Sequence, residues 1–167
     1  MFFHQPTTDL DPILALGAVA AGTTDTQTFT EVSMSQQYNG VFFLALIGTI
    51  TATGTATLQA KGSNTSGTYG AGTIGLFQHV DSGNTVQAQA TTGDSATLLF
   101  IDIFKPLVSY VRGQIVRATA NVVITGAVAF RYASIVGAVV PSGVATHSTL
   151  TSTPGYDRAS NPSLSTS

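Results

Sequence analysis

Alternation of hydroxyl and apolar residues is the clearest pattern in the chain. From Thr49 to Ala60, threonine or glutamine occupies each odd position, and an apolar residue or glycine occupies each even one. This period of two is that of a β-strand with one buried face. A stretch of this length is long for a single strand, so we predict two strands in a hairpin that turns near Thr53 and Gly54.

A nearly continuous apolar run, Val41 to Ile47, comes just before this segment. Such a run is typical of a strand that is covered on both faces or nearly so. Further β-rich stretches lie at residues 26–34, 73–80, 85–90, 96–104, 110–119 and 122–140. Alternation in the last stretch predicts that one set of side chains faces the same way: Val122, Ile124, Gly126, Val128, Phe130 and Tyr132.

About eight short strands with glycine-rich turns predict an all-β fold. We expect a single β-sandwich or jelly-roll-like domain, with a small barrel as the alternative. The domain is expected over residues 26–140, between an N-terminal arm (1–25) and an extended C-terminal tail (141–167). Within the arm, Pro12 follows an aspartate and favours a short helix that ends near Ala21.

Charge is scarce in this chain. Charged residues make up 8% of it, against about 25% in ordinary soluble domains. A monomer usually stays soluble through mixed surface charge. A surface of hydroxyls therefore predicts that other protein chains cover much of it when the protein functions. The alternative is a monomeric, hydroxyl-rich β-domain. The net charge is −2 and the six basic residues are scattered, so we expect no nucleic-acid partner. The apolar stretch from Ile13 to Ala21 is too short to cross a membrane, so no membrane partner is expected either.

The sequence contains no motif of a known catalytic or cofactor site, and no paired carboxylates. There is no cysteine, which excludes disulfides and thiolate chemistry. The histidines, His4, His79 and His147, are isolated, so no metal site is predicted. We therefore expect a protein that is not an enzyme and that holds no cofactor.

Asp102 is an acid inside an apolar run. A buried carboxylate is costly unless it is paired, so Asp102 should face outward, accept a hydrogen bond or meet a cation. Arg112 and Arg117, on strands expected to be neighbours, are the candidate partners in a structural ion pair. Arg131, in the last predicted strand, is a candidate anchor at an assembly interface.

One region resembles a family of small structural proteins of tailed bacteriophages. Those proteins have a stretch of the form IDIxxP…RYVRxxVxRGTAN and, upstream, a strand that ends in a Gly-Ser-Asn turn. The matching segments here are IDIFKP (101–106), YVR (110–112), IVRATAN (115–121) and LQAKGSN (58–64). Ser109 and Ala118 depart from the pattern, as does the length of the tail.

The resemblance implies a virion protein on the capsid exterior, made in the host cytoplasm. We expect a capsid cement or decoration protein that binds across major capsid protein subunits as a homotrimer. Isolated apolar side chains in the arms are the predicted interface anchors: Phe2, Phe3, Leu150, Tyr156 and Leu164. The alternatives are a head-to-tail connector or tail component, and a virion-displayed host-binding or carbohydrate-binding module. For the binding module, only Tyr38 and Tyr69 offer aromatic rings in predicted loops.

Overall fold

The computed structural model describes residues 10–34, 38–69, 76–77, 85–94 and 96–132, and the backbone of residues 144–150 and 157–160. These residues form strands and one short 3₁₀ turn, η1 (Thr92–Asp94), with no α-helix among them. The predicted all-β sandwich is confirmed. The strands are β1 (Leu10–Leu16), β2 (Val19–Gly22), β3 (Asp25–Thr28), β4 (Val32–Ser33), β5 (Gly40–Ile50), β6 (Thr55–Ser63), β7 (Gln87–Thr91), β8 (Leu98–Phe104), β9 (Tyr110–Ala118), β10 (Val122–Tyr132), β11 (Val144–Leu150) and β12 (Asp157–Ser160).

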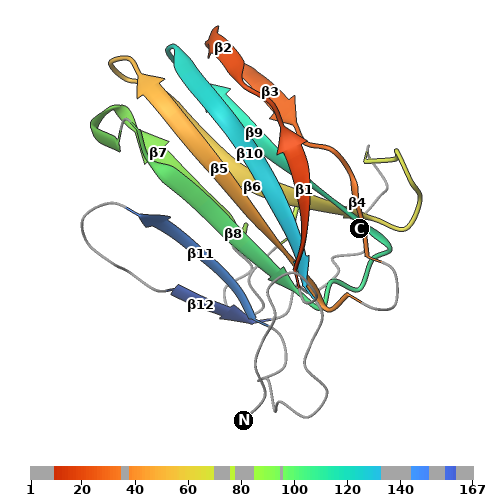
Figure 1. Cartoon of the computed structure of the whole chain (residues 1–167). Helices are drawn as coiled ribbons and strands as arrows, with labels where there is room; N and C mark the ends of the chain where they lie inside the picture. Colours follow the sequence, from red (N-terminus) through yellow and green to blue (C-terminus); the bar gives the residue numbers. More distant parts are fainter. Residues whose placement is uncertain are drawn as a thin grey trace.

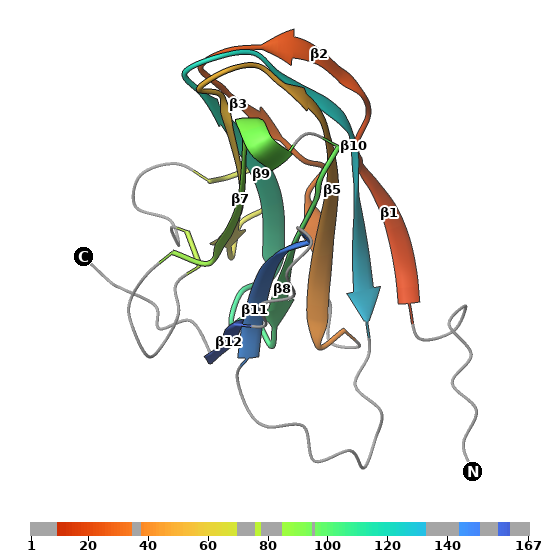
Figure 2. The same cartoon turned by 90° about the vertical axis from the view of Figure 1, so that its left-hand side faces the viewer.

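Two antiparallel sheets make up the sandwich (Figures 1 and 2). The larger sheet has the order β1-β10-β5-β8-β11-β12, and β2 also pairs with β10. The smaller sheet has the order β3-β9-β6-β7, and β4 also pairs with β9. Figure 2 shows the two sheets as separate layers, with β1, β10 and β5 in one and β3, β9 and β7 in the other.

The hydrophobic core lies between the two inner faces. Alternate residues along each strand point inward, as the period of two requires. The largest fully buried side chains come from both sheets and include Phe43, Ile47, Leu58, Leu99, Ile101, Ile103, Ile115 and Ile124. Burial of each such side chain stabilises the fold by about 1.5–3 kcal/mol.

The turn predicted between residues 49 and 60 exists, but the hairpin does not. Gly54 donates to the carbonyl of Thr51 at 2.9 Å, and Thr53 has a left-handed φ of 67°. However, β5 belongs to the larger sheet and β6 to the smaller one, so the turn carries the chain from one sheet to the other. The period of two identifies strands but does not choose their partners: β5 pairs with β10 and β8, and β6 with β9 and β7.

The helix predicted from Pro12 to Ala21 is wrong. Residues 10–22 form β1 and β2, which both pair with β10. Pairing satisfies the open edge of β10 and places Ala15 in the core, which outweighs a helix start signal. The predicted arm covers residues 1–25, of which the structure describes 10–25. Most of these described residues are thus part of the sandwich. Likewise β11, in the predicted tail, pairs with β8.

A β-bulge in β10 overturns the predicted alternation of that strand. Ile124 pairs with Ile47, but Gly126 pairs with the next residue back, Leu46, which leaves Thr125 as an extra residue. An extra residue in one strand reverses the side to which all later side chains point. Val122 and Ile124 therefore face the core with Ala127 and Ala129, whereas Val128, Phe130 and Tyr132 face outward.

Candidate functional site: an apolar outer face

The outer face of the larger sheet, turned away from the core, is apolar over four strands. Directly opposed residues in antiparallel strands point to the same side, so the pairing of β1, β10, β5 and β8 defines rows of side chains across this face. We call these rows together the apolar face. They are Leu14, Val128, Leu44 and Phe100; Pro12, Phe130, Phe42 and Asp102; and Gly126, Leu46 and Leu98.

Aromatic rings form the middle of the apolar face. The Phe42 ring lies 5.4 Å from that of Phe100 and 6.4 Å from that of Phe130, centroid to centroid. The face is open at two places: Leu14, on β1, is 71% exposed, and Leu46, on β5, is 41% exposed. The run from Val41 to Ile47 is predicted to be covered on both faces or nearly so. Among the described residues, its inner side is fully buried, and on its outer side Phe42 and Leu44 are half-buried and Leu46 is exposed.

A hollow of about 220 Å³ lies in this face. Its lining is almost entirely apolar and includes Leu14, Leu44, Leu46, Leu98 and Gly126. The hollow is present because Gly126 has no side chain: a Cβ built there meets no atom closer than the Leu16 carbonyl oxygen, at 3.5 Å. The face therefore holds a concave apolar site directly beside the exposed side chain of Leu14.

The outer face of the smaller sheet is polar. One row carries three glutamines, in which Gln114 donates to Gln59 and Gln59 donates to Gln87, each at 3.1 Å. In the next row Gln89 donates to the Thr57 hydroxyl at 3.2 Å. Gln114 is buried, whereas Gln87 and Gln89 are exposed, so the β7 side of this face suits contact with water. The two outer faces of one sandwich thus differ sharply in polarity.

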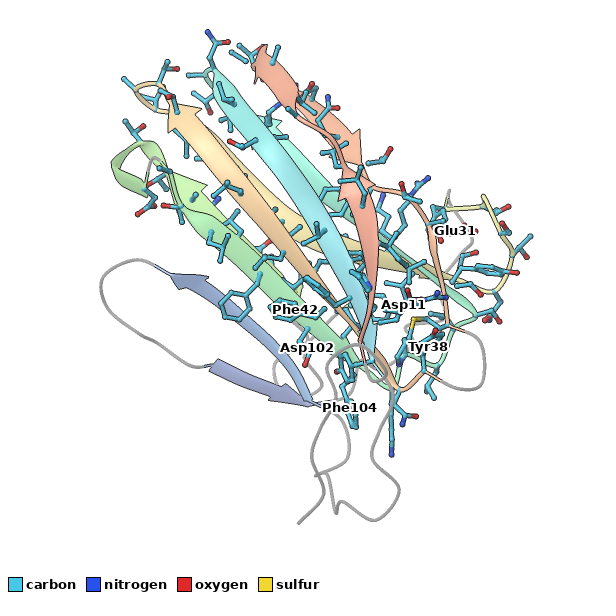
Figure 3. All side chains as sticks on the ribbon, viewed as in Figure 1. Asp11, Glu31, Tyr38, Phe42, Asp102 and Phe104 are labelled. Carbon is cyan, nitrogen blue, oxygen red and sulfur yellow. The ribbon has the colours of Figure 1, made fainter. Side chains whose placement is uncertain are left out.

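Asp102 is a polar group within the apolar face (Figure 3). Its carboxylate accepts a hydrogen bond of 2.7 Å from the Tyr132 hydroxyl. The contact spans β5, which separates the two strands, and it is possible because Gly40 lies between them: a Cβ at Gly40 would be 2.2 Å from the Tyr132 ring. Burial raises the pKa of Asp102 to about 6, although the bond from Tyr132 acts in the opposite direction. Burial and the neighbouring Asp102 carboxylate raise the pKa of Tyr132 as well.

The structure does not bring Asp102 together with Arg112 or Arg117, which are on β9 in the other sheet. Arg117 does form a structural ion pair, but with Asp25 on β3. Its guanidinium, which is buried, also donates to the carbonyls of Ala20 at 2.7 Å and Val122 at 2.9 Å. Arg117 therefore joins β2, β3 and β10 at one end of the sandwich. Its hydrogen bonds hold the pKa of Asp25 below its usual value.

Arg112 instead stacks on Tyr69, with its guanidinium carbon 4.0 Å from the ring centroid. Glu31 lies in the same cluster and accepts hydrogen bonds from the Ser66 hydroxyl at 2.6 Å and the Gly67 amide at 2.8 Å. Burial raises the pKa of Glu31, but these bonds outweigh it and the pKa is lowered overall. The cluster fixes the loop after β6 against the chain around Glu31.

Arg131 is engaged within the chain. It forms an ion pair with Asp11 on β1, donates to the Ser33 carbonyl at 3.0 Å and lies 4.2 Å from the centroid of Tyr38. Asp11 and Tyr38 are seen close together in Figure 3. Each of the two loop tyrosines, Tyr38 and Tyr69, therefore already carries a guanidinium on its ring. Tyr69 is also buried, whereas Tyr38 is half-buried.

The predicted anchors Phe2, Phe3, Tyr156 and Leu164 lie outside the described residues. Leu150 belongs to β11, where the backbone pairs Leu150 with Leu98 and the side chain is not described. The histidines His4 and His79 also fall outside the described residues, and His147 is described by its backbone alone. The sequence predicted none of the rows of the apolar face. The sequence feature that could have indicated this face is the unbroken apolar run of β5.

Comparison of the chain with protein-family models, with curated proteins and with solved structures gives no match. Within the described ranges, no helix has the length and apolarity needed to span a membrane. The described residues also contain no group of three or more histidine, aspartate and glutamate side chains placed to hold a metal ion.

Proposed function

We propose that this chain is a structural protein of a phage virion that stabilises the capsid as a cement or decoration protein, without catalytic activity. The observation that carries the proposal is the apolar face, with its open side chains Leu14 and Leu46. Contiguous apolar patches of this kind mark surfaces that other proteins cover. The opposite outer face is polar, so the apolar face is the one that we expect another protein to bury.

The topology supports the proposal. If β1 with β2, and β3 with β4, each count as one broken strand, the described residues up to the end of β10 form eight strands. Their order is then 1-8-3-6 in one sheet and 2-7-4-5 in the other. This order supports our proposal that the sandwich is a jelly roll, an architecture found in viral capsid proteins, lectins and cupins. A fold alone does not define a function; the phage-like stretch between residues 101 and 121 and the low charge also support the proposal.

The mechanism is linkage between binding and assembly. A protein that binds the closed shell, and not its separate subunits, stabilises the shell by about 2.7 kcal/mol when its free concentration is a hundred times its dissociation constant. Many weak contacts, repeated over the copies of a lattice, add to this through multivalency. We propose the homotrimer and the major capsid protein as the partners in these contacts.

The proposal is tested by adding the purified chain to capsids that lack it. We expect decoration at regular positions in electron micrographs and a higher temperature of shell opening. Leu46→Lys should abolish decoration because it places a charge on the apolar face. Gln87→Lys, on the polar outer face, is the matched control and should decorate normally. A wild-type chain that ignores the shell, or that forms a six- or twelvefold ring, would favour a connector or tail component instead.

A further inference from the structure

A protruding apolar side chain and an apolar hollow lie next to each other on the apolar face. Leu14, on the edge strand β1, is 71% exposed. The hollow beside it has a volume of about 220 Å³. A cavity of about 150 Å³ can hold a benzene ring, so the hollow has room for one leucine side chain. We propose that two copies of this chain pack their apolar faces together about a twofold axis, with Leu14 of each copy in the hollow of the other.

The position of the two features favours a second copy as the occupant. In a twofold interface the same patch serves both subunits, so a knob and its hole must lie on one surface. Leu14 and the hollow meet this condition, since Leu14 is itself part of the lining. A different partner would need only the hollow, and would leave no role for an exposed leucine at its rim.

The size of the apolar face is sufficient for this role. Five residues along each of β10, β5 and β8, and three along β1, at about 4.8 Å between strands and about 3.3 Å per residue, give a patch on the order of 300 Å². A standard interface covers about 800 Å² on each partner, with an apolar centre and a polar rim. The patch therefore provides the centre of such an interface, and the strand ends around it provide the rim.

Few charges lie in the contact. The rows of the face contain no lysine or arginine, and their one acid, Asp102, is hydrogen-bonded to Tyr132. Above the Asp102 pKa of about 6, each face brings this one carboxylate into the contact and no other charge from its rows. The inference rests on the proposed function and deepens it: the second copy is the protein that covers the apolar face, and the paired form is the one that decorates the shell. It concerns the contact between copies and can be tested without any capsid.

The first test measures the mass of the full-length chain in solution by sedimentation. We expect Leu14→Lys to halve the mass of the wild-type particle, whether this is a dimer or a pair of trimers. Gly126→Val, which fills the hollow from its floor, should do the same. Thr26→Lys, at an exposed position of β3 in the smaller sheet, is the control and should leave the mass unchanged. Circular dichroism checks that each variant folds.

The second test uses the absence of cysteine in the natural chain. A Leu14→Cys chain mixed with a Leu46→Cys chain of different mass should form mixed disulfide dimers on oxidation, at least tenfold more than a pair with Thr26→Cys. A wild-type monomer at every concentration, or an unchanged mass of Leu14→Lys, would overturn the proposal. So would a wild-type monomer that dimerises after removal of residues 1–9, because the chain's own N-terminus would then cover the face.

Discussion

Asp102 shows how one residue makes the stability of the fold depend on pH. Its pKa is about 6 in the folded chain and about 3.9 in an unfolded one. The folded state therefore binds a proton more tightly between these values, and its stability falls as the pH rises through this window. Above pH 6 the full cost of the buried charge applies. A difference of two pKa units corresponds to about 3 kcal/mol.

We predict that Asp102→Asn removes this dependence, since the amide carries no charge and its oxygen can still accept from Tyr132. The gain in free energy of unfolding relative to the wild type should be about 2–3 kcal/mol larger at pH 7 than at pH 4. Urea unfolding at both pH values measures it. If the free energy of unfolding changed equally with pH in the wild type and in Asp102→Asn, the raised pKa of Asp102 would be contradicted. Tyr132→Phe should have the opposite effect and lower stability mainly above pH 6.

The pairing of Asp102 with Tyr132 illustrates what the sequence could not provide. The apolar run predicted that Asp102 would face outward or find a partner, and it does both. The identity of the partner depends on a tyrosine 30 residues away, on the bulge that turns it outward and on a glycine between the two strands. None of these relations is local in sequence, so no periodicity could reveal them.

At the scale of elements, Arg117 connects β2 and β3 to β10. We predict that Arg117→Met, which keeps most of the apolar stem, destabilises the fold by about 2–4 kcal/mol, because two carbonyls and Asp25 lose their donor. Amide hydrogen exchange should show the loss of protection first in β2 and β3. Arg112→Met, which removes a stacking contact on Tyr69, is the matched control and should cost about 0.5–1 kcal/mol. Equal effects of the two changes would contradict this role for Arg117.

The positions of the strands were far easier to predict from the sequence than the pairing of each strand within a sheet. The stretches around residues 41–47, 96–104 and 110–119 correspond to β5, β8 and β9 because alternation and apolar runs depend on burial alone. Sheet membership depends on which distant strand offers a matching edge, so the expected hairpin at Thr53 proved to be a crossing between sheets. One extra residue, Thr125, reverses the side of the sheet to which the later side chains of β10 point. The period of two in the sequence does not reveal this extra residue.

The molecule as a whole is a sandwich with one apolar and one polar outer face. Association through the apolar face should depend little on salt, because the contact pairs no opposite charges. We predict that raising sodium chloride from about 0.05 M to about 0.5 M changes the dissociation constant less than threefold, and that sulfate tightens it. Sedimentation equilibrium measures both effects. A tenfold weakening in sodium chloride would show instead that ion pairs hold the copies together.

The position of β10 between β1 and β5 in the larger sheet has a consequence for synthesis on the ribosome. Both β1 and β5 use β10 as a partner, but β10 ends at Tyr132, long after those two strands have been made. A growing chain therefore carries β1 and the largely apolar β5 without the strand that lies between them. The larger sheet can close only when translation has passed Tyr132, so protection of the nascent chain by a chaperone matters most during that interval.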